Sequence, residues 1–184
     1  MATVGAFISL SLDGCYADAN GDMSWAHTQD PEQADFTAQN AKSGSGLLFG
    51  RITYDMMSSF WPTPAAAQMM PDVAASMNAL PKFVASRTLK AADWSNTKVF
   101  GGDLVGEVKQ LKASGPDLTI LGSGSIVAQL ATAGLLDSLD VMLVPVTLGG
   151  GKRLFEGLPR SLAWRREDTR QFSNGNVFLH YRPA

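Results

Sequence analysis

The sequence lacks several features that would assign it to a familiar protein class. It contains one cysteine, Cys15, and two histidines, so neither an internal disulfide nor a structural zinc site is expected. A single free cysteine suits a reducing compartment, and we expect a cytoplasmic protein. No apolar run approaches the roughly 20 residues that cross a bilayer. The alternating N-terminal stretch also lacks the basic region of a signal peptide.

Charge is scarce as well. Only 17% of the 184 residues are charged, the formal net charge is −2, and lysine and arginine form no cluster. This composition argues against nucleic acid or a membrane as the main partner and leaves a small molecule as the expected one. With 45% hydrophobic residues, the chain suits one globular domain over residues 1–184.

Hydrophobic periodicity predicts short strands that alternate with helices. Residues 4–12 alternate apolar and polar side chains and end at Asp13-Gly14, a turn signal. A polar surface loop is expected over 18–30. The other expected strands are 47–49, 82–86, 98–100, 118–121, 138–146, 162–171 and 177–182, and the expected helices are 31–42, 51–58, 73–79, 103–114 and 125–133. This order predicts an α/β fold with a mixed, mostly parallel sheet and a C-terminal antiparallel hairpin.

The turn Gly122-Ser123-Gly124-Ser125 separates a predicted strand from a predicted helix. Glycines let the backbone approach a ligand, and the N–H groups of a first helical turn attract anions such as phosphate. The turn is not the dinucleotide fingerprint G-x-G-x-x-G, because Val127 stands in place of the third glycine, and no Gly-Lys-Ser/Thr follows as in a P-loop. Taken alone, it is equally compatible with a plain tight connection.

Two more predicted strands are followed directly by small, hydroxyl or cationic residues: Gly50, Arg51 and Thr53 after one, and Ser86, Arg87 and Thr88 after the other. In an open α/β sheet, ligands bind beyond the carboxyl ends of the strands. Either arginine alone has a simple alternative as a solvated surface charge. The three strand ends together predict a site for the phosphates of a dinucleotide.

Segments that span most of the chain follow the order of a known superfamily: SLDGCYADANGDMSW, LLFGRITYDMM, MNALPKFVASRTLKAADWSNTKVF, LTILGSGSIVAQLATAGLLDSLDVMLVPVTLGGGKRLFEG and the terminal hairpin. The chain resembles the dihydrofolate reductase-like superfamily, and within it the branch of the C-terminal reductase domain of bacterial riboflavin biosynthesis. The resemblance implies three layers, with helices flanking a central eight-stranded mixed sheet. It also implies NADPH across the strand ends and a homodimer.

The resemblance implies a role for each motif. It places the pyrophosphate at Gly50, Arg51 and Thr53 and at Gly122, Ser123, Gly124, Ser125 and Ile126, the adenosine 2′-phosphate at Ser86 and Arg87, and the nicotinamide near Ser9, Tyr16 and Ala17. The residues favour NADPH over NADH, because a dianionic 2′-phosphate is bound well by a fixed cation and hydroxyl donors. Ser86, Arg87 and Thr88 supply both.

The resemblance also suggests catalytic candidates. Dihydrofolate reductases hold the pterin with a carboxylate on the helix after a tryptophan-containing loop. Here Trp25 matches that tryptophan, Asp30 stands at the matching offset, and Asp35, beside Phe36, is a second candidate. Each carboxylate has an alternative, Asp30 as a helix N-cap and Asp35 as an exposed helical charge. Phe7 replaces a basic residue of the riboflavin enzymes, so we do not expect their phosphorylated substrate.

We therefore predict an NADPH-dependent reductase that transfers a hydride to an unidentified small, flat heterocycle, pterin-like or pyrimidine-like, without a metal. A non-catalytic NADP(H)-binding module is the first alternative, and it would leave no carboxylate facing the nicotinamide pocket. True dihydrofolate reductase activity is the second alternative. It requires a buried carboxylate in a folate-sized cleft and cations for the glutamate tail.

Overall fold

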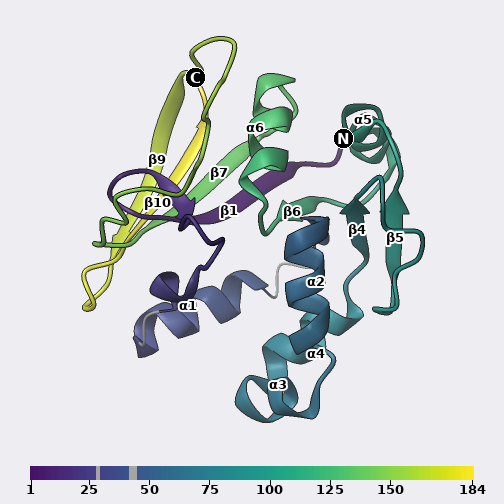
Figure 1. Ribbon diagram of the computed structural model, residues 1–184, viewed down its shortest axis with the longest axis horizontal. Helices are drawn as coiled ribbons and strands as arrows, with labels where there is room; N and C mark the ends of the chain where they lie inside the picture. The colour runs from purple at the N-terminus through teal and green to yellow at the C-terminus, as the bar shows by residue number, and fades with distance from the viewer. Residues whose placement is uncertain (28–29, 42–44) are drawn as a thin grey trace.

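The computed structural model describes residues 1–27, 30–41 and 45–184, and an eight-stranded mixed sheet dominates it (Figure 1). The strands lie in the order β5-β4-β3-β6-β1-β7-β10-β9. Their bounds are β1 Val4–Leu10, β3 Gly46–Gly50, β4 Lys82–Ala85, β5 Thr97–Phe100, β6 Leu118–Ile120, β7 Ser138–Leu143, β9 Trp164–Gln171 and β10 Val177–Pro183. The first six strands of that order run parallel, and β10 runs antiparallel to both β7 and β9. The predicted mixed sheet with its terminal hairpin is confirmed.

Helices cover both faces of the sheet, so its central strands are buried on two sides. The helices are α1 Pro31–Ala41, α2 Arg51–Phe60, α3 Pro64–Met69, α4 Pro71–Ala79, α5 Leu104–Ser114 and α6 Gly124–Thr132. On β3, Leu48 packs in the cluster that contains α5 and α6, whereas Leu47 and Phe49 pack in the cluster that contains α2 and α4. Figure 1 shows α6 on the opposite side of β1 and β6 from α1 and α2. None of the helices in the described part combines the length and apolar character that spanning a bilayer requires.

The structure differs from the sequence prediction mainly in short elements. Helix α3 was not expected, and Thr63 caps it by accepting a hydrogen bond from the amide of Ala66, with Pro64 in its first position. Strands β2 (Cys15–Ala17) and β8 (Lys152–Arg153) form a second, two-stranded sheet, and Ser24–Ala26 form a 3-10 turn. Elements of two or three residues are too short to carry a periodic pattern. Residues 28–29 of the predicted loop and residue 42 of the predicted helix lie outside the described residues.

A fully buried lysine closes the C-terminal end of α4. The Nζ of Lys82 donates hydrogen bonds to the carbonyl oxygens of Met77 at 2.8 Å, Asn78 at 3.1 Å and Leu80 at 2.7 Å. It also lies 4.5 Å from the centre of the Trp94 ring. The carbonyls at the end of a helix lack intrahelical partners and carry partial negative charge, so a cation is well placed there. Lys82 thereby joins α4 to β4.

Replacing Lys82 with methionine keeps most of the side-chain length and removes all three donors. We expect Lys82→Met to lower the free energy of unfolding by about 2–4 kcal/mol, because buried carbonyls lose their partner. Urea denaturation measures this loss. Lys98→Met is the matched control on the neighbouring strand, where the side chain is 66% exposed, and it should cost less than about 1 kcal/mol. Equal losses in the two variants would contradict the assignment.

The pH dependence of the unfolding free energy, compared between wild type and Lys82→Met, gives a second test. Burial lowers the pKa of Lys82 from 10.5 to about 8. The folded protein therefore releases this proton at a lower pH than the unfolded chain does, so its stability rises with pH through that interval. We expect the difference in unfolding free energy between wild type and Lys82→Met to grow from pH 8 to pH 10.5. A difference that stays constant or shrinks over that range would refute the lowered pKa of Lys82 in the folded protein.

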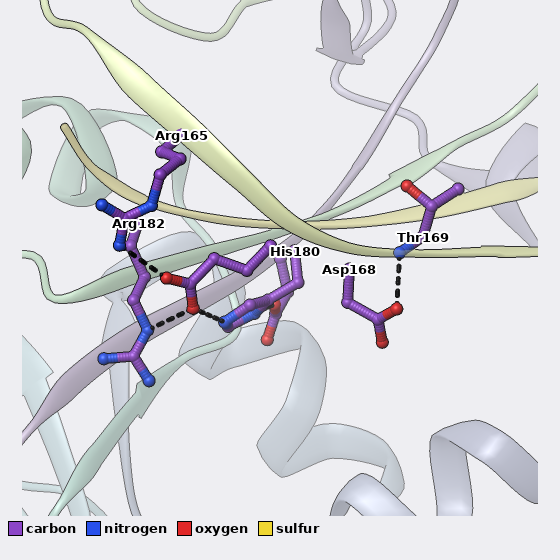
Figure 2. Close-up of polar contacts among 7 residues, drawn as sticks. Arg165, Asp168, Thr169, His180 and Arg182 are labelled. Carbon is purple, nitrogen blue, oxygen red and sulfur yellow. Dashed lines mark hydrogen bonds and ion pairs between the residues drawn. The ribbon is translucent and has the colours of Figure 1, made fainter.

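A network of charged side chains joins the last three strands of the sheet (Figure 2). Glu167 accepts a hydrogen bond from Arg165 at 2.7 Å and forms an ion pair with Arg182 at 2.9 Å, and the Nε2 of His180 lies 3.9 Å from the Glu167 carboxylate. The Nδ1 of His180 is 2.5 Å from a carboxylate oxygen of Asp140. The Arg165 hydrogen bond lowers the pKa of Glu167, whereas burial raises the pKa of Asp140. Since β9 is an edge strand, its charges also discourage pairing with another chain.

Candidate functional site

The two glycine-bearing turns predicted from the sequence lie against each other. Strands β3 and β6 are parallel neighbours, so their carboxyl ends share one edge of the sheet, and each strand leads directly into a helix. A Cβ atom on Gly50 would lie 2.8 Å from the hydroxyl oxygen of Ser123. A Cβ on Gly122, whose φ is +92°, would lie 3.4 Å from the hydroxyl oxygen of Thr53. The structure thus brings the two predicted halves of the phosphate site together.

The helices that begin at these turns have no side-chain N-cap. Gly50 has no side chain to offer α2, and Ser123, the N-cap residue of α6, makes no capping bond because its hydroxyl pairs with that of Ser125 at 2.8 Å. Helices α3 and α5, by contrast, are capped by Thr63 and Asp103. Helix α4 also lacks a side-chain cap, but proline at its start removes one of the donors. The first-turn amides of α2, and those of Gly124 and Ser125 at the start of α6, are therefore available to an anion.

Tyr16 forms one wall of this region. It belongs to β2, and its ring packs so closely on Gly124 that a Cβ there would overlap it. Burial raises the pKa of Tyr16, and the charge of Glu156 adds to this effect. Ala17 is buried, and its carbonyl oxygen faces Gly151, the residue before β8, at a point where no Cβ would fit.

Ser9 and Ile126 occupy different settings. Ser9 lies near the carboxyl end of β1, where it pairs with Met142 of β7, and it is partly buried. Ile126 is buried in the main core cluster, and its amide donates to the carbonyl of Ser123 at 3.1 Å. The Ile126 side chain therefore fixes the position of α6. Its amide already has a backbone partner and is not free for a ligand.

The third predicted strand end, that of β4, points toward the same edge of the sheet, but the residues that follow it are more exposed. Strand β4 lies beside β3, so Ser86, Arg87 and Thr88 leave the sheet at the same edge. The Ser86 hydroxyl accepts hydrogen bonds from the amides of Thr88 at 3.2 Å and Leu89 at 3.0 Å, and so shapes the turn. Arg87 and Thr88 are exposed. Within the described part of the chain, the Arg87 guanidinium has neither a hydrogen bond nor an ion pair.

Arg51, at the first position of α2, is half exposed and pairs with Asp55 one turn later at 2.8 Å. An exposed ion pair of this kind contributes little to stability, so a phosphate can compete for the guanidinium.

A surface depression of about 430 Å³ runs along α6, between Val105 and residues 156–159. Its lining includes none of the predicted site residues.

The two candidate carboxylates differ sharply. Asp30 is buried and caps α1 through the amide of Gln33 at 2.8 Å. Its second oxygen accepts hydrogen bonds from Ser173 and from the amide of Asn174. Asp35 is exposed. A catalytic role for either residue stays a prediction, and the donors that surround Asp30 do not favour it.

Asp13, predicted from the sequence only as part of a turn, positions the glycine loop that contacts Ala17. Its carboxylate accepts hydrogen bonds from the Ser11 hydroxyl at 2.6 Å and from the amides of Leu148 and Gly149 at 3.2 and 3.0 Å. The run of three glycines from Gly149 was the available signal, because consecutive glycines mark close backbone approaches.

Comparison with known proteins identifies the family. The model of the RibD C-terminal domain matches residues 2–178. The chain belongs to the RibD C-terminal domain family. The Bacillus subtilis (strain 168) protein YyaP is 29% identical over 178 residues, which cover 95% of this chain and 91% of that protein.

Solved structures agree with this membership. A crystal structure from Shewanella sp. PV-4, whose name refers to riboflavin biosynthesis, is 27% identical with a TM-score of 0.78, over 100% of this chain and 99% of that one. A pyrimidine reductase-like protein from Corynebacterium diphtheriae has a TM-score of 0.68 at 14% identity, over 100% of this chain and 92% of that one. The second likeness shows the fold alone. Both confirm the fold expected of a RibD C-terminal domain.

The contact between Gly124 and Tyr16 can be tested by substitution. We expect Gly124→Ala to lower the free energy of unfolding by about 1–3 kcal/mol, because the new methyl group overlaps the tyrosine ring. Once the ring has been removed by Tyr16→Ala, adding Gly124→Ala should cost less free energy of unfolding than it costs in the wild-type protein. Gly102→Ala, where a Cβ meets open space, is the control. Thermal unfolding measures all four variants, and additive losses would argue against the contact.

Proposed function

We propose that this protein is an NADPH-dependent reductase that transfers a hydride to a small, flat heterocyclic acceptor. One observation carries the proposal. Two helices with uncapped first turns begin side by side at the edge where six parallel strands end, in a chain of the RibD C-terminal domain family. A pyrophosphate has the charge and the acceptor oxygens that such amides require.

The residues present fit this cofactor. The pyrophosphate would lie between the turn at Gly50 and the turn that begins at Gly122, with the hydroxyls of Thr53 and Ser125 as additional donors. Arg51 would exchange its exposed partner on α2 for a phosphate oxygen. The 2′-phosphate would meet Arg87 and Thr88, whose turn is held in shape by the Ser86 hydroxyl. Such charge-assisted contacts are stronger than those between neutral groups.

The nicotinamide end would lie toward β1 and β2, beside Ser9, Tyr16 and Ala17. When bound, NADPH supplies the hydride, and the protein contributes alignment and exclusion of water. The Shewanella protein, whose name refers to riboflavin biosynthesis, supports a heterocyclic acceptor of the pyrimidine-like or pterin-like kind. We extend the proposal to a homodimer, which size-exclusion chromatography with light scattering would test.

A non-catalytic NADP(H)-binding module is the second candidate. It is favoured by the position of Asp30, whose two oxygens are taken up by donors of α1 and of the β9–β10 turn. The same contacts count against true dihydrofolate reductase activity, which needs a carboxylate free to hold the pterin. A catalytic reductase would oxidise NADPH in the presence of a suitable pterin or pyrimidine, and a binding module would not.

Cofactor titration of the Arg87→Ala variant tests the proposal. Loss of one charge-assisted phosphate contact is worth about 1.5–3 kcal/mol, so the Kd for NADPH should rise about 10- to 100-fold. The Kd for NADH should change little, because NADH has no 2′-phosphate. Calorimetry or the fluorescence of the reduced nicotinamide gives both constants.

Arg160→Ala is the matched control, because Arg160 is also exposed but borders a depression beside the C-terminal end of α6. It should leave both constants unchanged. An Arg87→Ala variant that binds NADPH as tightly as wild type would remove the 2′-phosphate assignment. A wild-type protein that binds neither nucleotide would overturn the proposed function.

A further inference from the structure

Helix α1 lies beside α4, and its described side chains make few apolar contacts with the rest of the protein. Of its side chains that the structure describes, Phe36 alone packs against a hydrophobic cluster, with its ring 4.7 Å from Phe178 and 5.7 Å from Phe172. That cluster also contains Met142 and Val144, at the carboxyl end of β7. Most of the other described side chains of α1 are exposed. A helix held by so few apolar contacts needs other interactions to stay in place.

Polar contacts supply them, and those of the described α1 side chains with the rest of the protein join the N-terminal half of the helix to the terminal hairpin. One oxygen of Asp30 caps the helix at the amide of Gln33, while the other accepts a hydrogen bond from the Ser173 hydroxyl at 2.6 Å and from the amide of Asn174 at 3.2 Å. The Gln33 side-chain oxygen accepts hydrogen bonds from the amide groups of Asn174 at 2.9 Å and Asn176 at 2.7 Å. Asp30 is thus the one side chain among these that both starts the helix and holds it to the hairpin.

An arginine strengthens the same junction. Arg170 of β9 pairs with Glu32 at 2.7 Å and lies over the rings of Phe36 and Phe172, at 5.1 and 5.4 Å from their centres. Both members of the ion pair are about half exposed, so the pair itself contributes little. The hydrogen bonds of the buried Asp30 carboxylate are therefore expected to dominate the junction.

We propose that Asp30 is a positioning residue that latches helix α1 to the β9–β10 turn, so that α1 opens as a unit when this contact is broken while the sheet stays folded. Opening uncovers the aromatic side chains beneath Phe36. If the proposed function holds, this motion would also affect the acceptor, because α1 would form a movable wall of the site on the side of β7 and β1. This part of the inference rests on the proposed function. The latch itself requires no cofactor.

Hydrogen exchange followed by mass spectrometry tests the latch. Asp30→Ser keeps an N-cap, since serine caps helices well, but it is too short to reach the hairpin while capping. Ser173→Ala keeps the cap and removes one latch contact. We expect amide exchange in residues 31–41 to become roughly tenfold faster or more in each variant, because a charge-assisted hydrogen bond is lost. The double variant should show no further acceleration from Ser173→Ala.

Asp103→Ser is the matched control. Asp103 also caps a helix, accepting from the amide of Gly106, and its carboxylate has no partner beyond α5 among the residues described. Exchange in α1 should be unaffected by this change. The urea midpoint of the Asp30→Ser protein should stay near that of wild type, because a local opening does not require global unfolding.

Two outcomes would overturn the latch. The first is wild-type exchange of α1 in Asp30→Ser or in Ser173→Ala, and the second is an equal acceleration throughout the chain, which would mean a general loss of stability. NADPH titration keeps this test separate from the proposed function. Asp30→Ser should bind NADPH as wild type does, and failure of the wild type to bind NADPH would leave the exchange result intact.

Discussion

Two parallel strands that end side by side, each continuing at once into a helix, create a demand for hydrogen-bond acceptors at one edge of the sheet. The first amides of α2 and α6 point outward there without a side-chain partner. Most local features of the site follow from this arrangement. Gly50 is small because the Ser123 hydroxyl lies against it, and Gly122 adopts a left-handed backbone beside Thr53. Capping hydrogen bonds like those that Asp103 and Thr63 accept at α5 and α3 are missing from α2 and α6.

The second sheet depends on the same edge. Strand β2 brings Tyr16 onto Gly124, and β8 holds β2 in place through a glycine loop whose amides bind Asp13. The close approach of Gly151 to the carbonyl of Ala17 leaves no space for a side chain. The short β2–β8 pair is thus held by the contact of Tyr16 with Gly124, by the contact of Gly151 with Ala17, and by the Asp13 carboxylate.

The sequence was sufficient to predict elements whose signals are local. Helix α5 was predicted from Asp103 at its start and Gly115 after its end, and the structure has it at Leu104–Ser114. The glycine turns and their place after buried strands were likewise read from neighbouring residues. The N-cap role of Asp30 was considered for the same reason.

The contact of Asp30 with the β9–β10 turn was not predictable, because Ser173 lies 143 residues away and no local pattern links the two. The three-residue β2 and two-residue β8 were missed because they exist only through their pairing. The roles of Ser9, Tyr16 and Arg87 toward a cofactor remain predictions.

The enclosed ammonium of Lys82 has a practical consequence. All three of its protons are directed at carbonyl oxygens, and the Trp94 ring covers it. A reagent that acylates amines cannot reach this nitrogen while the end of α4 stays attached to β4, whereas exposed lysines such as Lys98 react directly with solvent-borne reagents. The rate at which Lys82 becomes labelled therefore reports how often that corner of the molecule comes apart, without any added probe.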